Sequence, residues 1–361
     1  MSLRPAQAGE PSLEEALATL YALSFEDRLE AVLDDPAAAL PAVILVDEAI
    51  GETQIRALLQ ASRAGRRLAD IPIVYLAEQA NSALTKDAID AWGVVIAKPF
   101  GRKQVLVAVS QAINIAIEDH WQGLQELESA ALHSSLNAFQ SITDNIINGQ
   151  PLQYDAVASS CQALQTAITE GRHTNILQAV QWHDDYTYVH SMSVATCLSM
   201  FGHAIGLKGD DLLMLTTGGL LHDVGKARIP LEVLNKKGKL DQQEWVSMRK
   251  HVDFGIEYIQ LCEDMPKGVG CIAGQHHEKL DGTGYPKGLA GKQINDLARM
   301  AAIVDIFSAL TDRRVYKAAQ KAEQALDRMA EMSATLDQTL LSTFRSMLLD
   351  LSRDFEGDRA Y

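Results

Sequence analysis

The sequence predicts a multidomain protein in which an N-terminal α/β domain, with a parallel sheet and flanking helices, is joined by a long helix to an all-α domain. Three observations predict this fold class. Short apolar runs alternate with helical patterns near the N-terminus, a sustained helical pattern follows, and almost only helical patterns fill the second half. At 361 residues the chain is long enough for two domains that each bury a core.

Three apolar runs predict the strands of the first domain, at residues 41–49, 71–78 and 93–101. The stretches between them carry helical patterning. Because strands that alternate with helices form a parallel sheet covered by helices, we expect an α/β domain at residues 1–118.

The middle of the chain predicts one long amphipathic helix, with a linker helix at residues 119–150. Apolar residues recur there every three or four positions, at Ile113, Ile117, Trp121, Leu124, Leu127 and Ala131. Such a stripe either pairs with a second copy of the chain, giving a homodimer, or packs on its own domain, and the sequence leaves both open. Residues 151–345 then form the helical domain, and residues 346–361 a C-terminal tail.

Composition excludes several classes of protein. The formal charge of −15 opposes broad binding to nucleic acid or anionic lipid, although it leaves room for one locally positive pocket. The chain has no apolar run of about 18 residues, and its N-terminus lacks the order of a signal peptide. The four cysteines are scattered without a CxxC, which fits reduced thiols. We therefore expect a cytoplasmic protein without nucleic-acid or membrane partners.

Histidines and acids of the second half form the candidate site. The runs "TTGGLLHDVGK" and "ARMAAIVDIFSAL" each carry an acid in a mostly apolar setting. A carboxylate in such a setting is costly unless it has a cation, a hydrogen-bond partner or a metal. Seven groups could together supply two metal sites: His190, His222, Asp223, His251, His276, His277 and Asp305.

Several motifs of this half occur in a recognisable order. These are "YTYVHS", "LLHDVGKARIP", "KKGKLDQQEWVSMRKHVDFG", "HHEKLDGTGYPKGL" and "ARMAAIVDIFSALTDRRVYKA". In sequence and order they resemble the HD-GYP domain of bacterial cyclic di-GMP phosphodiesterases, over about residues 150–340. A lone His-Asp pair often occurs by chance, whereas an ordered set of motifs is specific.

The resemblance implies an all-helical fold, a two-metal centre and hydrolysis of cyclic di-GMP through a metal-bridging hydroxide, in second-messenger signalling. It leaves open whether linear pGpG or GMP is the end product. It implies His190, His222, Asp223 and Asp305 as the ligands of one metal. It implies His251, His276 and His277 as the ligands of the other metal, with Asp223 bridging. The mixed nitrogen and oxygen set suits two divalent ions, for which we expect iron or manganese.

Basic residues complete the implied site. Lys226 follows His222 by four positions and is expected, with Asp223, to take part in catalysis by contacting a phosphate oxygen. Arg314 and Lys317 match positions that the family uses for the substrate phosphate or guanine. The alternative for each of these three residues is a solvated charge on the surface with no role in the site.

The glycine-rich segment after His277 is expected to position the site. Gly282 and Gly284 permit positive φ or close approach, and Tyr285 with Pro286 makes the loop rigid. Glu278 is expected to orient a neighbouring imidazole through a hydrogen bond, since ligating imidazoles have such a partner.

Two departures from the family pattern affect the expected function. Tyr186 stands where some members carry a glutamate for a third metal, so we expect two metals. Ser308 replaces an aspartate three positions after Asp305, which predicts weaker metal orientation. The alternative is therefore a weakly active or inactive HD-GYP domain that acts as a nucleotide-binding and protein-interaction module. A general HD nucleotidase is a third interpretation, against which the GYP segment argues.

Residues 38–118 resemble a response-regulator receiver domain. Asp47 ends "VILVD" at the phosphoacceptor position, and Lys98 with Pro99 matches the lysine-proline of the last strand. Ala77 replaces the usual hydroxyl residue, and the acidic pair that holds magnesium after the first strand of a receiver is not found upstream of "SLEEALATLY". We expect a degenerate receiver that serves dimerisation or partner binding, with a sensor kinase or a diguanylate cyclase (GGDEF) protein as partner.

Overall fold

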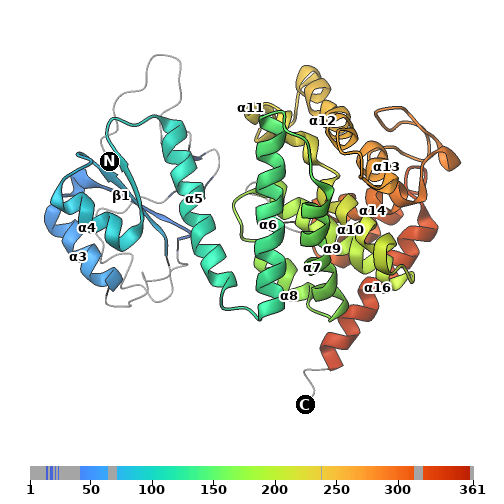
Figure 1. The fold of residues 1–361 in the computed structure, drawn as a ribbon, viewed down its shortest axis with the longest axis horizontal. Coiled ribbons are helices and arrows are strands. Elements are labelled where there is room, and N and C mark those ends of the chain that lie inside the picture. The colour runs from blue at the N-terminus through green and yellow to red at the C-terminus, as the bar shows by residue number, and fades with distance from the viewer. Residues whose placement is uncertain are drawn as a thin grey trace. The chain divides into compact units, whose positions relative to one another are not determined.

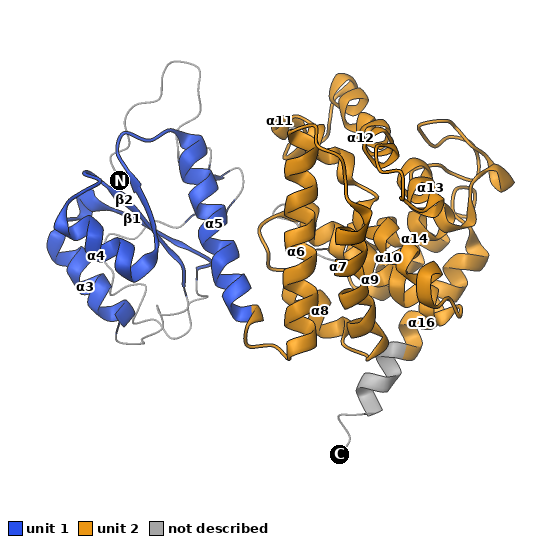
Figure 2. Cartoon of the chain, in the orientation of Figure 1, with its two compact units in different colours: residues 1–120 blue, residues 121–361 orange. Residues whose placement is uncertain are grey.

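The computed structural model describes residues 41–63, 71–236, 238–312 and 320–357, with side chains to 350. Nearer the N-terminus it describes Glu14, Leu17, Ala18, Tyr21 and Leu23. The chain forms two compact units, residues 1–120 and 121–361, which Figure 2 colours separately. Within the described residues, no helix has the length and apolar character that crossing a bilayer requires.

A parallel sheet forms the centre of the first unit. Its strands are β1 (Ile44–Asp47), β2 (Ile73–Ala77) and β3 (Val94–Ala97), in the order β1-β2-β3. Both pairings are parallel, with Asp47 opposite Leu76 and Leu76 opposite Ile96. The predicted parallel sheet is therefore confirmed within the described residues.

Helices cover both faces of this sheet (Figure 1). They are α3 (Glu52–Arg63), α4 (Ala83–Trp92) and α5 (Arg102–Trp121), and a short 3-10 turn η1 (Glu48–Ile50) follows β1. Alternate residues of β2 enter two apolar layers: Tyr75 packs among residues of α3 and α4, and Leu76 among residues of α5. A strand covered on both faces needs apolar residues on both, which explains the continuous run "IVYLA".

The single long helix expected in the middle of the chain is replaced by two helices, α5 and α6 (Glu126–Ile147). Between them the backbone N–H of Gln125 donates to the Glu128 carboxylate at 3.2 Å, which begins the second helix. The apolar stripe is shared by two cores, because Ile113 is buried in the first unit and Trp121 and Ala131 are buried in the second.

The second unit is helical throughout the part that the structure describes, as predicted. After α6 it contains α7 (Tyr154–Thr169), α8 (His173–Val180), α9 (Tyr186–Ala204), α10 (Gly209–Leu221), η2 (Val224–Arg228), α11 (Leu231–Leu234), α12 (Gln242–Gln260), α13 (Lys267–Gln275), η3 (Gly291–Gln293), α14 (Asp296–Thr311), α15 (Ala322–Ala330) and α16 (Gln338–Gly357).

Helix α9 lies at the centre of this unit and packs against α7, α8, α10 and α14. Every residue from Tyr188 to Gly202 is buried, as expected of a helix that is apolar all round. At Gly219 of α10, a Cβ atom would lie 2.7 Å from the Cα of Ala195, so glycine permits the close approach of these two helices. This packing sets the position of the chain that follows α10, where the candidate site begins.

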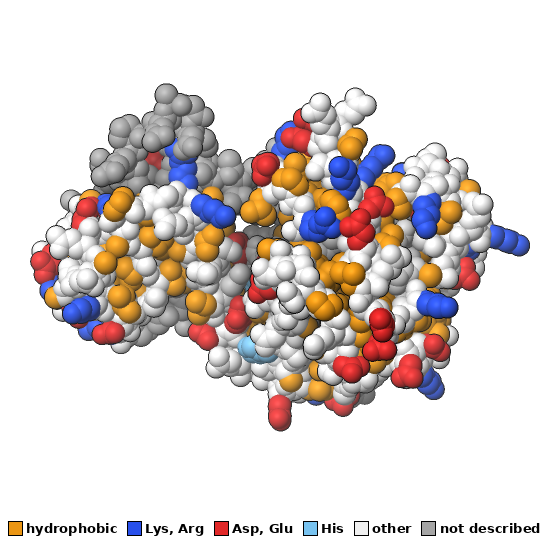
Figure 3. Space-filling view, turned by 45° about the horizontal axis from the view of Figure 1, so that its top comes forward, with side chains coloured by type: hydrophobic (Ala, Val, Ile, Leu, Met, Phe, Trp, Pro, Cys, Tyr) orange, Lys and Arg blue, Asp and Glu red, His pale blue; other side chains and the backbone are white. Residues whose placement is uncertain are grey.

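The surface carries charges of both signs. Figure 3 shows acidic and basic side chains over the same face of the second unit, with apolar side chains between them.

Candidate metal centre

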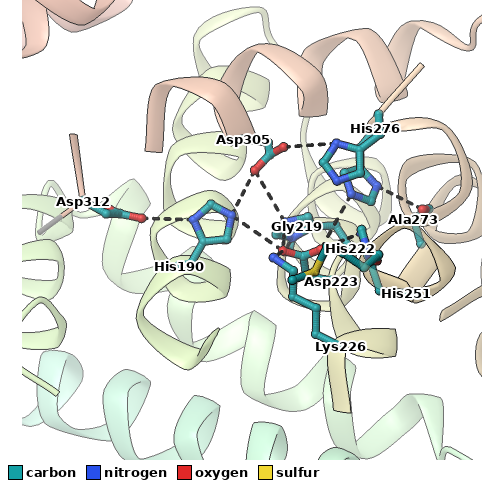
Figure 4. Close-up of polar contacts among 12 residues, drawn as sticks. His190, Gly219, His222, Asp223, Lys226, His251, Ala273, His276, Asp305 and Asp312 are labelled. Atoms are coloured by element: carbon teal, nitrogen blue, oxygen red, sulfur yellow. Dashed lines mark hydrogen bonds and ion pairs between the residues drawn. The ribbon is translucent and has the colours of Figure 1, made fainter. Parts of the chain in front are cut away.

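Five helical elements bring the seven predicted ligands together in the second unit (Figure 4). His190 lies on α9, His251 on α12 and Asp305 on α14. The other four follow the ends of α10 and α13: His222, Asp223, His276 and His277. Two groups of donors result, one formed by His190, His222 and Asp305 and the other by Asp223, His251, His276 and His277.

Backbone carbonyls fix three of the imidazoles. The Nδ1–H groups of His222 and His251 donate to the carbonyl oxygens of Gly219 and Met248, at 2.7 and 2.6 Å. His276 donates in the same way to Ala273, at 3.0 Å. A proton held on Nδ1 leaves the Nε2 lone pair of each ring free, which is the tautomer that a metal ligand needs.

The free ring nitrogens have no hydrogen-bond partner within the described part of the chain, although they are buried. This holds for Nε2 of His222, His251 and His276, and it also holds for Oδ1 of Asp223. Leaving such atoms unpaired costs about 1–3 kcal/mol each. Four of them that face one another fit a site whose partners are cations.

The carboxylate of Asp223 lies between the two groups of donors. Its Oδ2 is 3.2 Å from His222 Nε2 and 3.8 Å from His190 Nε2. Its Oδ1 is 3.2 Å from His251 Nε2 and 3.8 Å from His276 Nε2. Ligand atoms about 2.1 Å from one cation lie about 3 Å apart when adjacent and about 4 Å apart when opposite, so these separations fit a carboxylate that bridges two ions.

His190 differs from the other imidazoles because both ring nitrogens face carboxylates. Its Nε2 lies 2.9 Å from Asp305 Oδ1, and its Nδ1 lies 3.0 Å from Asp312 Oδ2. Burial disfavours the charged ring, but these two hydrogen bonds outweigh it and raise the pKa of His190 to about 9. Asp312 was missed by the sequence reasoning, although it lies seven residues after Asp305 and so on the same helix face.

The remaining charges of the centre are set by burial and by neighbours. Burial and the nearby His277 hold the pKa of His276 well below its usual value. Burial also lowers the pKa of His277 to about 4. Burial opposes ionisation of Asp223, but Lys226 and His222 hold its pKa well below the usual range. At neutral pH the centre therefore offers neutral imidazoles from His276 and His277 together with an ionised Asp223.

Lys226 lies on η2 and forms an ion pair with Oδ2 of Asp223 (Figure 4). The Lys226 side chain is 19% exposed, so it lies at the edge of the centre. Its place beside the predicted ligands agrees with the sequence expectation for its position.

The role expected for Glu278 is corrected. Its carboxylate does not orient an imidazole; instead it accepts the backbone N–H groups of Lys287 and Leu289, at 2.7 and 2.9 Å. The reason is geometric, because the glycine-rich loop folds back over Glu278, while His276 is already held by a carbonyl of its own helix.

The loop approaches the centre closely. A Cβ on Gly284 would lie 2.5 Å from the Cα of Glu278 and 2.6 Å from the carbonyl oxygen of His277, and Gly282 has a φ of 78°. Pro286 follows Tyr285, whose ring centroid lies 4.7 Å from that of His277. The glycines are thus required by close approach and by left-handed backbone, as predicted.

The two departures from the family pattern also lie in this centre. Tyr186 stacks its ring on that of His190, with centroids 5.8 Å apart and an interplanar angle of 17°. Ser308 is buried on α14, and its hydroxyl oxygen has no hydrogen-bond partner in the described chain. Arg314 and Lys317 lie outside the described residues.

In the first unit, Asp47 is buried at the end of β1. Its Oδ1 accepts from Lys98 Nζ at 2.8 Å and from the N–H of Ala49 at 3.0 Å. Lys98 Nζ also contacts Glu78 Oε1 at 2.6 Å. Burial opposes the charge of Lys98, but its bonds to Asp47 and Glu78 raise its pKa.

Comparisons with known proteins identify relatives that are named as cyclic dinucleotide phosphodiesterases. The cyclic di-GMP phosphodiesterase PA4108 of Pseudomonas aeruginosa is 40% identical over 178 residues, which cover 48% of this chain and 42% of that protein. The 3′3′-cGAMP-specific phosphodiesterase 2 of Vibrio cholerae is 41% identical over 144 residues, covering 40% and 28%. The cyclic di-GMP phosphodiesterase response regulator RpfG of Xanthomonas campestris is 34% identical over 154 residues, covering 42% and 41%.

The chain spans less than half the length of each of these relatives. A family model, that of the HD domain, matches residues 152–340. This range is more than half of the 361 residues and contains all seven grouped donors. The chain belongs to the HD domain family.

Proposed function

We propose that this chain is a metal-dependent phosphodiesterase that hydrolyses cyclic di-GMP to linear pGpG, with GMP as the alternative end product. The single observation that carries the proposal is the position of Asp223, whose two carboxylate oxygens face two separate sets of imidazole nitrogens. The names of the relatives, which are cyclic dinucleotide phosphodiesterases, support the same reaction class.

The seven grouped residues are proposed as ligands of two divalent ions, with Asp223 shared between them. Iron or manganese is proposed because the donors mix imidazole nitrogen with carboxylate oxygen. When bound, a pair of such ions supplies a water of lowered pKa as nucleophile and stabilises charge on the phosphoryl oxygens.

Lys226 is proposed to act on the substrate phosphate. Its ammonium pairs with Asp223, which removes the cost of burying that carboxylate alone. With Asp223 engaged as a metal ligand, Lys226 would be free to donate to a phosphoryl oxygen of the substrate. The His277 side chain is 26% exposed while His222 and His251 are fully enclosed, so the substrate is proposed to enter on the His277 side.

Arg314 and Lys317 remain proposed contacts to phosphate or guanine. The second unit contributes few other cations to the centre among its described residues, so two basic residues shortly after α14 would add the positive charge that a dinucleotide with two phosphates needs.

The test is a hydrolysis assay with metal analysis. Protein purified without oxygen and loaded with Mn²⁺ or Fe²⁺ is incubated separately with cyclic di-GMP, 3′3′-cGAMP and cyclic di-AMP, and the products are separated by chromatography. We expect pGpG from cyclic di-GMP. The variant His222→Ala should lose metal and activity together, whereas His203→Ala, which removes an exposed histidine of α9, should retain both.

Two outcomes would change the proposal. Faster hydrolysis of 3′3′-cGAMP than of cyclic di-GMP would replace the substrate but keep the reaction class. Unchanged substrates in the presence of two bound ions per chain would favour the alternative, a nucleotide-binding signalling module.

The first unit is proposed to be a degenerate receiver-like domain that binds a partner, with a sensor kinase, a GGDEF protein or a second copy of the chain as candidates. Ala77 at the end of β2 offers no hydroxyl group at the position where a receiver carries one, which supports the interpretation as a degenerate receiver. Acetyl phosphate with Mg²⁺ should leave Asp47 unmodified when the intact mass is measured. An added phosphoryl group that Asp47→Asn abolishes would show a functional receiver instead.

A further inference from the structure

The imidazole of His190 is held between two carboxylates that come from one helix and its end. Asp305 lies within α14, and Asp312 is the residue that caps its C-terminus. The two acids contact opposite nitrogens of the ring, Nε2 at 2.9 Å and Nδ1 at 3.0 Å (Figure 4). Only Nε2 faces the other donors of the centre, so Asp312 contacts His190 from the side away from the proposed ions.

Asp312 is fixed in this position by the structure around it. Its side chain is 9% exposed, and its backbone N–H donates to the Ser308 carbonyl at 2.7 Å, which ends α14. Ser308 lies one helical turn earlier, on the same face as Asp305 and Asp312. That serine is buried, and its hydroxyl oxygen has no hydrogen-bond partner among the described residues. The second acid on this face of the helix is therefore residue 312, because residue 308 is a serine.

His190 differs from the other imidazoles in the group that accepts its Nδ1–H. His222, His251 and His276 each donate from Nδ1 to a neutral carbonyl of their own chain segment. A carboxylate in the same place fixes the same tautomer but also makes the ring a stronger base, and therefore a stronger ligand through Nε2.

We propose that Asp312 is a positioning residue for His190, which replaces the acid missing at Ser308. It accepts the Nδ1–H of His190 and thereby directs the Nε2 lone pair toward the metal shared with Asp305 and His222. The inference rests on the proposed function only in requiring that metal occupies the centre. It also reverses the expectation from sequence that the serine at 308 weakens metal orientation.

The experiment compares metal binding in three variants of the full chain: Asp312→Ser, Asp312→Asn and the double variant Ser308→Asp with Asp312→Ser. Mn²⁺ is titrated into metal-free protein, and the absorption spectrum of the Co²⁺-loaded protein reports the geometry around the ions. We expect Asp312→Ser to weaken one of two Mn²⁺ sites by about 10–100-fold, the usual effect of losing a partner of a ligating imidazole. The Mn²⁺ affinity of Asp312→Asn should lie between those of the wild type and Asp312→Ser. An amide oxygen still accepts the hydrogen bond from Nδ1–H but carries no negative charge.

The double variant tests the replacement directly. An acid moved to position 308 should restore most of the lost Mn²⁺ affinity and the wild-type Co²⁺ spectrum. Asp327→Ser is the matched control, because Asp327 is an exposed carboxylate of the same unit that pairs with Arg345 at 2.8 Å. It should change neither readout. If Asp312→Ser does not fold, the Mn²⁺ affinity of the isosteric Asp312→Asn variant is compared with that of the wild type instead.

The outcomes separate this inference from the proposed function. Equal Mn²⁺ affinities in wild type and in Asp312→Ser would overturn the positioning role, and a double variant that restores nothing would overturn the replacement of residue 308. Wild-type protein that binds Mn²⁺ but leaves every cyclic dinucleotide intact would refute the proposed function alone, since the titration still decides the role of Asp312. A wild type that binds no metal overturns both.

Discussion

Gly225 on η2 packs directly against the backbone carbonyl oxygen of His251 on α12, because a Cβ at this position would lie 2.0 Å from that oxygen. A Cβ at this position would also lie 2.5 Å from the backbone nitrogen of Gly255. The short 3-10 turn carrying Lys226 and the helix carrying His251 are thus held at backbone contact distance. This contact therefore helps to set the distance between Asp223 and His251, which is 3.2 Å from Oδ1 to Nε2.

Replacing Gly225 by alanine should therefore disturb both fold and metal binding. We expect Gly225→Ala to lower the free energy of unfolding by about 1–3 kcal/mol, because backbone must move to accept the methyl group. Mn²⁺ affinity should fall as well. Gly270→Ala is the control: on α13 its Cβ would meet nothing closer than 4.0 Å, and we expect a gain of about 0.5–1 kcal/mol. Urea unfolding measures the stability of both variants. A free energy of unfolding of Gly225→Ala equal to that of the wild type would contradict the role of this backbone contact.

Lys226→Met should separate catalysis from metal binding. The substitution removes the ammonium beside Asp223 while keeping a similar apolar stem, so metal content should stay the same or rise. We expect kcat for cyclic di-GMP to fall by about 10²–10³-fold, the usual cost of removing one group that stabilises charge in the transition state. Lys250→Met, an exposed lysine of α12, should have no effect. Metal loss in Lys226→Met would instead indicate a structural role.

Glu278→Gln should loosen the glycine-rich loop without emptying the centre. The carboxylate holds two backbone N–H groups, and an amide offers only one oxygen as acceptor. We expect a loss of about 1–3 kcal/mol in the free energy of unfolding, with metal content preserved. Asp281→Asn is a control in the same loop, because Asp281 is exposed and bonds only locally to Thr283. A variant that loses metal would return Glu278 to the role first expected from the sequence.

The pH dependence of the metal-free protein should be bell-shaped. The folded pKa of His190 is raised to about 9, so its contribution to stability is present below its unfolded pKa of about 6.5 and is lost as pH rises through 9. The folded pKa of His277 is lowered to about 4, so stability is lost as pH falls from about 6.5 toward 4. Thermal unfolding in EDTA should therefore give a maximum at a pH of about 6.5.

Two variants assign the arms of this curve. His190→Gln should flatten the alkaline arm. His277→Gln should make the acid arm shallower but not remove it, because burial also lowers the pKa values of His276 and His183. A curve whose alkaline arm survives in His190→Gln would show that another group carries it.

Much of the fold was predictable because its signals are local. The apolar runs and alternating helical patterns identified the parallel sheet, and the almost exclusively helical patterns after about residue 151 identified the helical unit. The break between α5 and α6 was not predicted, because the apolar stripe runs through Trp121 and Leu124 without a change of period. Which core a residue of the stripe enters depends on tertiary packing, and Gly123 was the only local signal of the break.

The grouping of the seven predicted ligands was also expected, because each lies in a segment of recognisable motif. Their role as ligands stays a prediction. Asp312 was missed although it stands in the same quoted motif as Asp305, because only the end of α14 brings its carboxylate to His190. Glu278 was given the wrong partner because sequence adjacency to two histidines suggested an imidazole, whereas the returning loop supplies nearer donors.

The placement of Asp223 has a consequence for how the centre would fill. One carboxylate faces both donor sets, so two ions held there would share its single negative charge and repel each other. The two sites would then fill one after the other, the second at a higher free metal concentration than the first.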